Sequence, residues 1–154
     1  MKIVFLVICF VLDIIATTIF KGQLQFSFSF SLIGMCYYIT DMLFSDAFIH
    51  GWLIGFIYGL LNVNYVFAYG IIFLLVSIVY RVWKKYITDS IVETLVFFTA
   101  IIAIKEVIHF GIFKLFGITS IPLMIWINEI LIIALIANIV PIFIVDRLAS
   151  YFIK

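Results

Sequence analysis

The feature that most constrains this chain is a nearly unbroken apolar sequence. Of its 154 residues, 68% are hydrophobic and only 11% are charged. Soluble domains carry roughly 25% charged residues, because a surface that faces water must be covered with hydrated side chains. The sequence therefore predicts an integral membrane protein of the cell membrane, with the lipid bilayer as its main solvent.

Short polar or turn-like clusters divide the sequence into six predicted spans. A helix needs about 20 residues to cross a hydrocarbon core roughly 30 Å thick. Helices are expected because open sheets would leave unpaired backbone groups in lipid. We therefore predict an all-α, multi-pass protein, a single transmembrane domain that forms a compact bundle of six helices with short loops. The predicted spans are residues 3–20, 26–44, 47–61, 65–83, 91–113 and 121–145.

The basic residues of the predicted loops indicate an orientation. Cytoplasmic loops of membrane proteins carry an excess of Lys and Arg. If both ends of the chain are cytoplasmic, most of the Lys and Arg residues in the loops lie inside the cell. Lys105 is counted as intramembrane and left out of this comparison. The cytoplasmic basic residues are then Lys2, Arg81, Lys84, Lys85, Arg147 and Lys154, and the external ones are Lys21 and Lys114.

Several function classes are excluded by composition and motif. A net charge of +1 provides no electrostatic footprint for nucleic acid. The two cysteines, Cys9 and Cys36, lie in apolar runs without the spacing of a metal site, and the two histidines, His50 and His109, are isolated. Nucleophile-elbow, phosphate-loop and zinc-protease motifs are absent. We therefore expect a protein that is not an enzyme and needs no cofactor or metal.

A stripe of glycines marks the third predicted span. Gly51, Gly55 and Gly59 recur at a spacing of four and therefore share one face of a helix. Glycine allows a neighbouring backbone to approach closely, which is how helices associate in lipid. The stripe favours packing within this subunit over a direct contact with a partner, and Gly70 is expected to play the same packing role in the next span.

A set of polar residues within the spans forms a predicted intramembrane cluster. Ionisable groups in lipid are costly unless they are paired or hydrated. We expect Lys105 to neutralise Asp13 or Glu129 and so to fix the register of the helices. A proton or substrate pathway is the less favoured interpretation. The cluster comprises Asp13, Lys105, Glu106, His109, Asn128 and Glu129.

The glycine-striped span resembles the rod-shape-determining protein family MreD. The resemblance rests on the stretch from Gly51 to Leu61 followed by Gly70, and on Asn138 and Pro141 in the last span. Members of that family have about this length and consist of a similar number of spans with very short loops. The sequence departs from the family at one point. The family commonly has an acidic residue two positions after Gly-Leu-Leu, whereas here Gly59-Leu60-Leu61 is followed by Asn62-Val63-Asn64.

The resemblance implies a non-enzymatic subunit of the bacterial cell-elongation machinery. Its partner would be an MreC-like single-span protein and, indirectly, the glycosyltransferase and transpeptidase that build peptidoglycan. A compact bundle with short loops offers mainly helix surfaces for such contacts. On this interpretation the face of Gly51, Gly55 and Gly59, or the surface beside it, contributes to binding the partner.

An alternative from another class is the substrate-binding subunit of an energy-coupling-factor vitamin importer, whose six-helix bundle is similar. Such subunits usually carry pairs of alanines on the first span, where this chain has only Ala16. A vitamin pocket near the outer face would be lined by Glu106, His109 and Glu129.

Overall fold

The computed structural model describes residues 1–20, 28–62, 65–86 and 90–153, and its regular structure within these ranges is entirely helical. The predicted all-α class is therefore confirmed. In chain order the elements are α1 (Lys2–Ile19), α2 (Phe30–Ile39), α3 (Phe44–Asn62), α4 (Val66–Trp83), the 3₁₀ turn η1 (Lys84–Tyr86), α5 (Ile91–Leu115), α6 (Leu123–Ile125), the π-helical turn η2 (Trp126–Leu131), α7 (Ile132–Ala137) and α8 (Ile139–Phe152).

Four helical stretches of the described chain are long and apolar enough to cross a membrane. The two predicted spans that are not among them correspond to α2, which has only ten residues, and α5, which has 25 residues and carries the charged pair Lys105 and Glu106. The four stretches are Lys2–Ile19, Phe44–Leu61, Val66–Tyr86 and Leu123–Phe152. A multi-pass membrane protein is thus supported.

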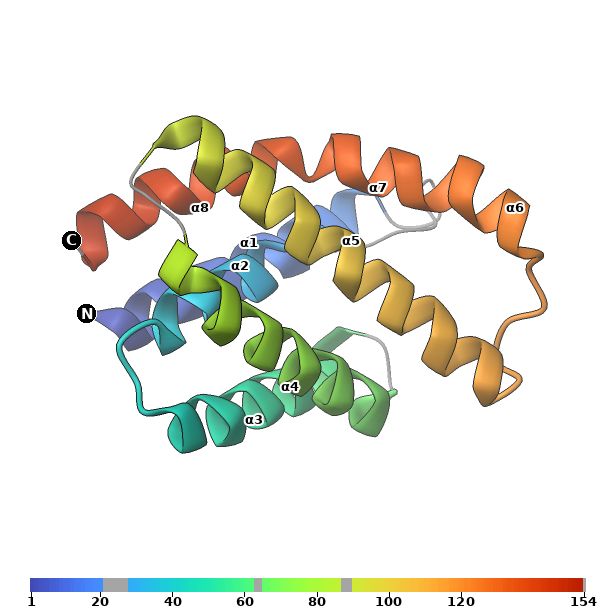
Figure 1. Ribbon diagram of the computed structural model, residues 1–154, viewed down its shortest axis with the longest axis horizontal. Coiled ribbons are helices and arrows are strands. Elements are labelled where there is room, and N and C mark those ends of the chain that lie inside the picture. The colour runs from blue at the N-terminus through green and yellow to red at the C-terminus, as the bar shows by residue number, and fades with distance from the viewer. Residues whose placement is uncertain (21–27, 63–64, 87–89, 154) are drawn as a thin grey trace.

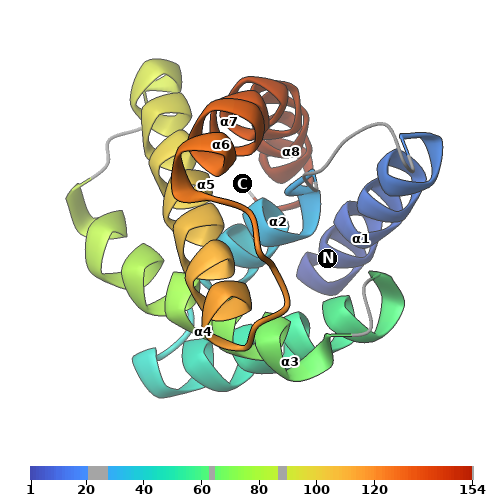
Figure 2. The same ribbon diagram turned by 90° about the vertical axis from the view of Figure 1, so that its right-hand side faces the viewer.

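The short helix α2 lies in the middle of the bundle. It packs against α1, α3, α4 and α8, and Figure 2 shows it surrounded by the longer helices. Ten residues of helix rise only about 15 Å, which is half the thickness of a hydrocarbon core. A helix this short is tolerated at membrane depth where protein surrounds it. In agreement, most of its side chains are buried, from Phe30 to Ile39.

Successive helical stretches run in opposite directions along the long axis of the molecule (Figure 1). Both termini therefore lie at one end, and the connection between α5 and α6 lies at the other. The predicted break at residues 21–23 and part of the break at 62–64 lie outside the described residues, as do Lys21 and Lys154.

The last helical stretch is longer and less regular than the predicted span 121–145. It begins at Leu123, continues to Phe152 and is interrupted at Asn138, between α7 and α8. Pro141 explains the interruption, because proline has no N–H and its ring clashes with the carbonyl four residues earlier. The predicted span covers only the apolar segment, and the helix continues past it through the charged residues Asp146 and Arg147.

Helices α3 and α4 approach closely along the glycine stripe. A Cβ atom added at Gly55 would overlap the carbonyl oxygen of Tyr69, and one at Gly59 would lie 2.7 Å from the Cα atom of Val66. From the other helix, Gly70 faces the indole of Trp52, whose Nε1 would lie 3.0 Å from an added Cβ.

Gly51 belongs to the same contact, because a Cβ atom there would overlap the side chain of Ser77. The stripe of Gly51, Gly55 and Gly59 is therefore filled by α4 of the same chain. This is the packing within the subunit that the sequence favoured over a partner contact. A partner has no room on the glycine face itself, which leaves the surface beside it.

A prediction follows for Gly55. Replacing Gly55 with Ala should lower the free energy of unfolding by about 1–3 kcal/mol, because the added methyl group must push the backbone of α4 away. The matched control is Gly111→Ala, since nothing lies within 4 Å of a Cβ atom at that helical position. That control should be neutral or stabilising by up to about 1 kcal/mol. Thermal unfolding in detergent micelles, followed by circular dichroism, measures both; equal stability of the two variants would contradict the close packing.

Candidate functional site

The candidate site is a set of polar residues buried between apolar helices. A polar group removed from solvent costs free energy unless it finds a hydrogen-bond partner, so each of these residues requires an explanation. In the described part of the chain they are Asp13, Ser29, Ser31, Ser77, Lys105, Glu106 and Asn138.

Asp13 of α1 binds the N-terminus of α2. Its Oδ1 accepts the backbone N–H of Phe30 at 3.1 Å, and its Oδ2 accepts the backbone N–H of Ser31 at 2.8 Å and also the hydroxyl of Ser31. The first N–H groups of a helix have no partner within the helix, and the helix dipole favours a negative charge beside them. Asp13 lies about 17 Å along the apolar helix α1 from Lys2 and is fully buried, so water does not supply such partners.

Asn138 completes the same junction from the last helical stretch. Its Oδ1 accepts the backbone N–H of Ser29 at 2.7 Å, and its Nδ2 donates to the carbonyl oxygen of Ala134 at 2.9 Å. The interruption near Pro141 thus places an amide side chain against the start of α2. Sequence analysis noted Asn138 only as part of the resemblance and missed Ser29 and Ser31, although serines at the start of a helix are a known cap signal.

Lys105 and Glu106 form a buried ion pair on α5. The distance from Lys105 Nζ to Glu106 Oε1 is 2.6 Å, and both side chains are 3% exposed. The expected partners of Lys105 were Asp13 and Glu129. The nearest carboxylate partner is nevertheless Glu106, which neighbours Lys105 in sequence, and the structure places Glu129 elsewhere.

His109 forms the more open edge of this group. Its Nδ1 lies 3.7 Å from Glu106 Oε2, and its side chain is 26% exposed. Its ring contacts Phe113, with ring centroids 4.3 Å apart, and Tyr69, at 5.6 Å. Lys105, Glu106 and His109 therefore form one group on α5, whereas the carboxylate of Asp13 is bound to the start of α2.

Asn128 and Glu129 do not join the cluster, which corrects the prediction. They lie on the exposed face of η2, whereas Trp126, Ile130 and Ala134 form the buried face of the same stretch. The prediction grouped residues by their depth in a span, and depth does not indicate which side of a helix faces the bundle.

Arg81 of α4 closes the opposite end of α2. Its Nη1 donates to the carbonyl oxygen of Thr40, and its Nη2 donates to that of Met42 at 2.7 Å. A positive charge at a helix C-terminus interacts favourably with the helix dipole. The hydroxyl of Tyr80, the residue before Arg81, lies 2.6 Å from the hydroxyl of Thr40. Sequence analysis counted Arg81 only as a cytoplasmic charge, because no local pattern indicates that it reaches back to α2.

The chemistry of these contacts holds helices together. Asp13, Asn138 and Arg81 bind backbone groups at the two ends of α2, and each belongs to a different helical stretch. Lys105 and Glu106 neutralise each other within α5. Within the described ranges, no three His, Cys, Asp or Glu side chains are grouped so that they could hold a metal ion.

A prediction follows for Asp13. Replacing Asp13 with Asn should lower the free energy of unfolding by about 1–3 kcal/mol, because one of the two backbone N–H groups would then face an amide NH₂ donor instead of an oxygen. The control is Asp46→Asn, an exposed residue in the first turn of α3, which should cost less than about 1 kcal/mol. Denaturation in micelles measures both variants, and a wild-type midpoint for Asp13→Asn would show that the carboxylate is dispensable.

Comparison with known proteins identifies no relative of this chain. No protein-family model, curated protein or solved structure matches the chain. In its described residues the chain is an all-helical membrane-type bundle, in which the buried charges bind helix ends and one another.

Proposed function

We propose that this protein is a non-enzymatic, multi-pass subunit of the bacterial cell membrane that acts by binding other membrane proteins. The observation that carries the proposal is the structural role of Asp13. This residue is fully buried, and its two carboxylate oxygens both accept hydrogen bonds from the start of α2. A carboxylate committed to a helix end serves as a structural support. A proton or substrate pathway requires a group that is free to exchange its partner.

The machinery we propose is the one that elongates rod-shaped cells, in which an MreD-like subunit binds an MreC-like single-span protein. Through that protein the chain would support the glycosyltransferase and transpeptidase of peptidoglycan synthesis. The resemblance of the stretch from Gly51 to Gly70 supports this assignment. Because α4 fills the glycine stripe, we place the partner contact on an outward helix face.

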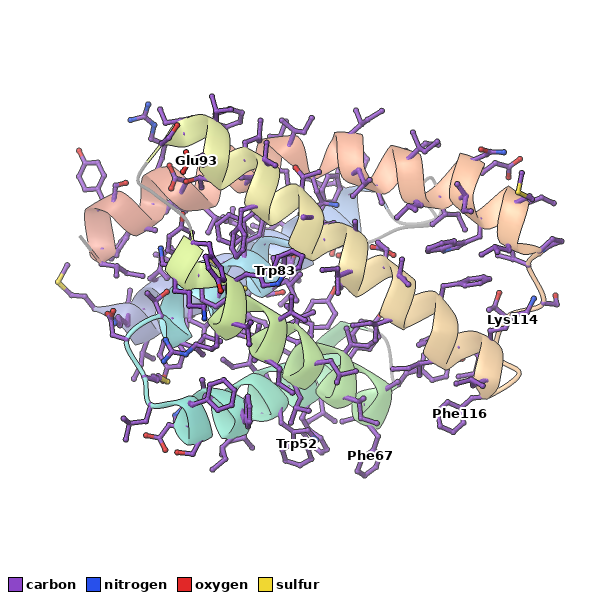
Figure 3. The ribbon with its side chains drawn as sticks, viewed as in Figure 1. Trp52, Phe67, Trp83, Glu93, Lys114 and Phe116 are labelled. Atoms are coloured by element: carbon purple, nitrogen blue, oxygen red, sulfur yellow. The ribbon has the colours of Figure 1, made fainter. Side chains whose placement is uncertain are left out.

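We further propose that the chain crosses the membrane six times with both ends in the cytoplasm. The alternating direction of the helical stretches and the shared end of the two termini support an even number of crossings (Figure 1). Lys114 and Phe116 lie at the end opposite the termini (Figure 3), as expected for an external loop. In this arrangement α2 makes a short crossing inside the bundle, and α5 makes one with its charged pair facing inward.

The importer alternative loses the residues on which it depended. A vitamin pocket was expected to be lined by Glu106, His109 and Glu129, whereas Glu106 is buried and Glu129 lies on the exposed face of η2. Co-purification of importer components is therefore the competing outcome of the affinity purification described below.

Two serine substitutions test the orientation. Ser120 in the connection before α6 and Ser150 in α8 are both exposed, and each differs from Cys by one atom. In intact cells a membrane-impermeant maleimide should label Ser120→Cys and not Ser150→Cys, while both should be labelled after permeabilisation. The native Cys9 and Cys36 are buried and should give little background. Labelling of Ser150→Cys in intact cells would overturn the cytoplasmic C-terminus.

The function itself is tested by affinity purification of the tagged full chain from its native host in mild detergent, with mass spectrometry of the proteins that accompany it. A similarly tagged, unrelated multi-pass protein is the control. Enrichment of an MreC-like single-span protein together with peptidoglycan synthases is the expected result. Enrichment of ATPases and a transmembrane coupling subunit would overturn the proposal in favour of the importer.

A further inference from the structure

The outward face of the last helical stretch is apolar except at one point. Its exposed side chains recur at spacings of three and four residues, the pattern of a helix surface that packs against another helix. The only charged group in this row is Glu129, with Asn128 beside it. We call this row the outer stripe; it comprises Ile125, Glu129, Ile132, Ile136, Ile139 and Phe143.

Glu129 lies within the depth of the hydrocarbon core. Asp146 and Arg147 are the first charged residues that follow it, and they mark one boundary of the crossing. A crossing of about 20 residues before them begins near residue 126. Glu129 is then about one helical turn inside the opposite boundary, where an unpaired carboxylate is costly.

Within the described part of the chain, Glu129 has neither a hydrogen bond nor an ion pair. The stretch around it is also lightly attached to the bundle. Phe110 of α5 stacks on Trp126 with ring centroids 4.5 Å apart, whereas α6 has its main contacts with η2. Figure 1 shows this stretch at the periphery of the molecule, so that its outward face is open along its length.

We propose that Glu129 anchors a transmembrane helix of the partner protein, which carries a Lys or Arg at the same depth and packs along the outer stripe. This inference rests on the proposed function and specifies the docking surface and the chemistry of the partner. Charge complementarity identifies the occupant, because the carboxylate requires a cationic donor and no described residue of the chain supplies one. Lys114, the nearest basic residue in sequence, donates to the carbonyl oxygen of Ile121 instead. A second copy of the chain packed on the same stripe would bring two Glu129 carboxylates together.

The polar anchor also fixes the position of the partner. Apolar side chains at the spacing of the outer stripe permit several registers, because each helical turn offers a similar surface. A single ion pair within an apolar interface selects the register in which the two charges meet. Asn128, next to Glu129, provides an amide that can hydrogen-bond the same donor.

The test compares Glu129→Gln and Glu129→Lys with the wild-type chain in the affinity purification. Recovery of the single-span partner should fall about three- to tenfold for Glu129→Gln, the range of interhelical polar contacts in membranes, and further for Glu129→Lys. Reversing the partner's basic residue to Glu should restore recovery with Glu129→Lys. The control is Asp46→Asn, which removes an exposed carboxylate in the first turn of α3 and should leave recovery unchanged.

The possible outcomes separate the two proposals. Wild-type recovery by both Glu129 variants, with unchanged thermal unfolding, overturns the anchor and leaves the proposed function standing. Absence of a single-span partner from the wild-type purification overturns the proposed function and the anchor with it. Glu129→Gln could instead lose a bound amino lipid or a homodimer while the single-span partner is still recovered. That result would assign the outer stripe to another occupant and also overturn the proposal.

Discussion

The carboxylate of Asp13 at the start of α2 is the interaction on which the arrangement of this bundle depends. A ten-residue helix surrounded by other helices exposes unpaired N–H groups at one end and unpaired carbonyls at the other. Lipid offers no partner for either set, so the chain supplies them from its other helices. Asp13 and Asn138 bind the N-terminal end, and Arg81 binds the residues that follow the C-terminal end. The negative and positive groups stand at the ends where the helix dipole favours them.

This arrangement explains why the chain tolerates charges that would otherwise be costly in a membrane. Each buried charge lies beside a helix end or an opposite charge, as Asp13 does at α2 and as Lys105 and Glu106 do within α5. The packing of α3 on α4 depends instead on close approach, as in the contact of Gly55 with α4. Polar contacts therefore determine which helices meet at α2, and small residues determine how closely α3 and α4 pack.

Much of the fold was predictable because hydrophobicity is a property of local sequence. The predicted spans 3–20, 65–83 and 91–113 agree with α1, α4 and α5 to within two residues. The predicted span 26–44 is longer than α2 because it includes the polar residues Ser29, Thr40 and Asp41, which flank the helix. Depth in a span selected Asp13, Lys105, Glu106 and His109 as intramembrane polar residues, but it did not indicate that Asp13 binds α2 while the other three lie together on α5. The separate position of Asn128 and Glu129 and the reach of Arg81 to α2 depend on the rotation of each helix about its axis, which no short pattern in the sequence records.

The junction at Asn138 has a consequence for how the chain is made. Ser29 and Asn138 are separated by 109 positions, so the cap at the start of α2 is complete only after nearly the whole chain has been synthesised. Arg81, 39 positions after Met42, arrives earlier. Until α8 arrives, the start of α2 lacks one of the partners that make a half-length helix acceptable in lipid. Insertion of this protein therefore cannot proceed as a series of independent helices, and its second helix acquires its final place only when the last one has entered the membrane.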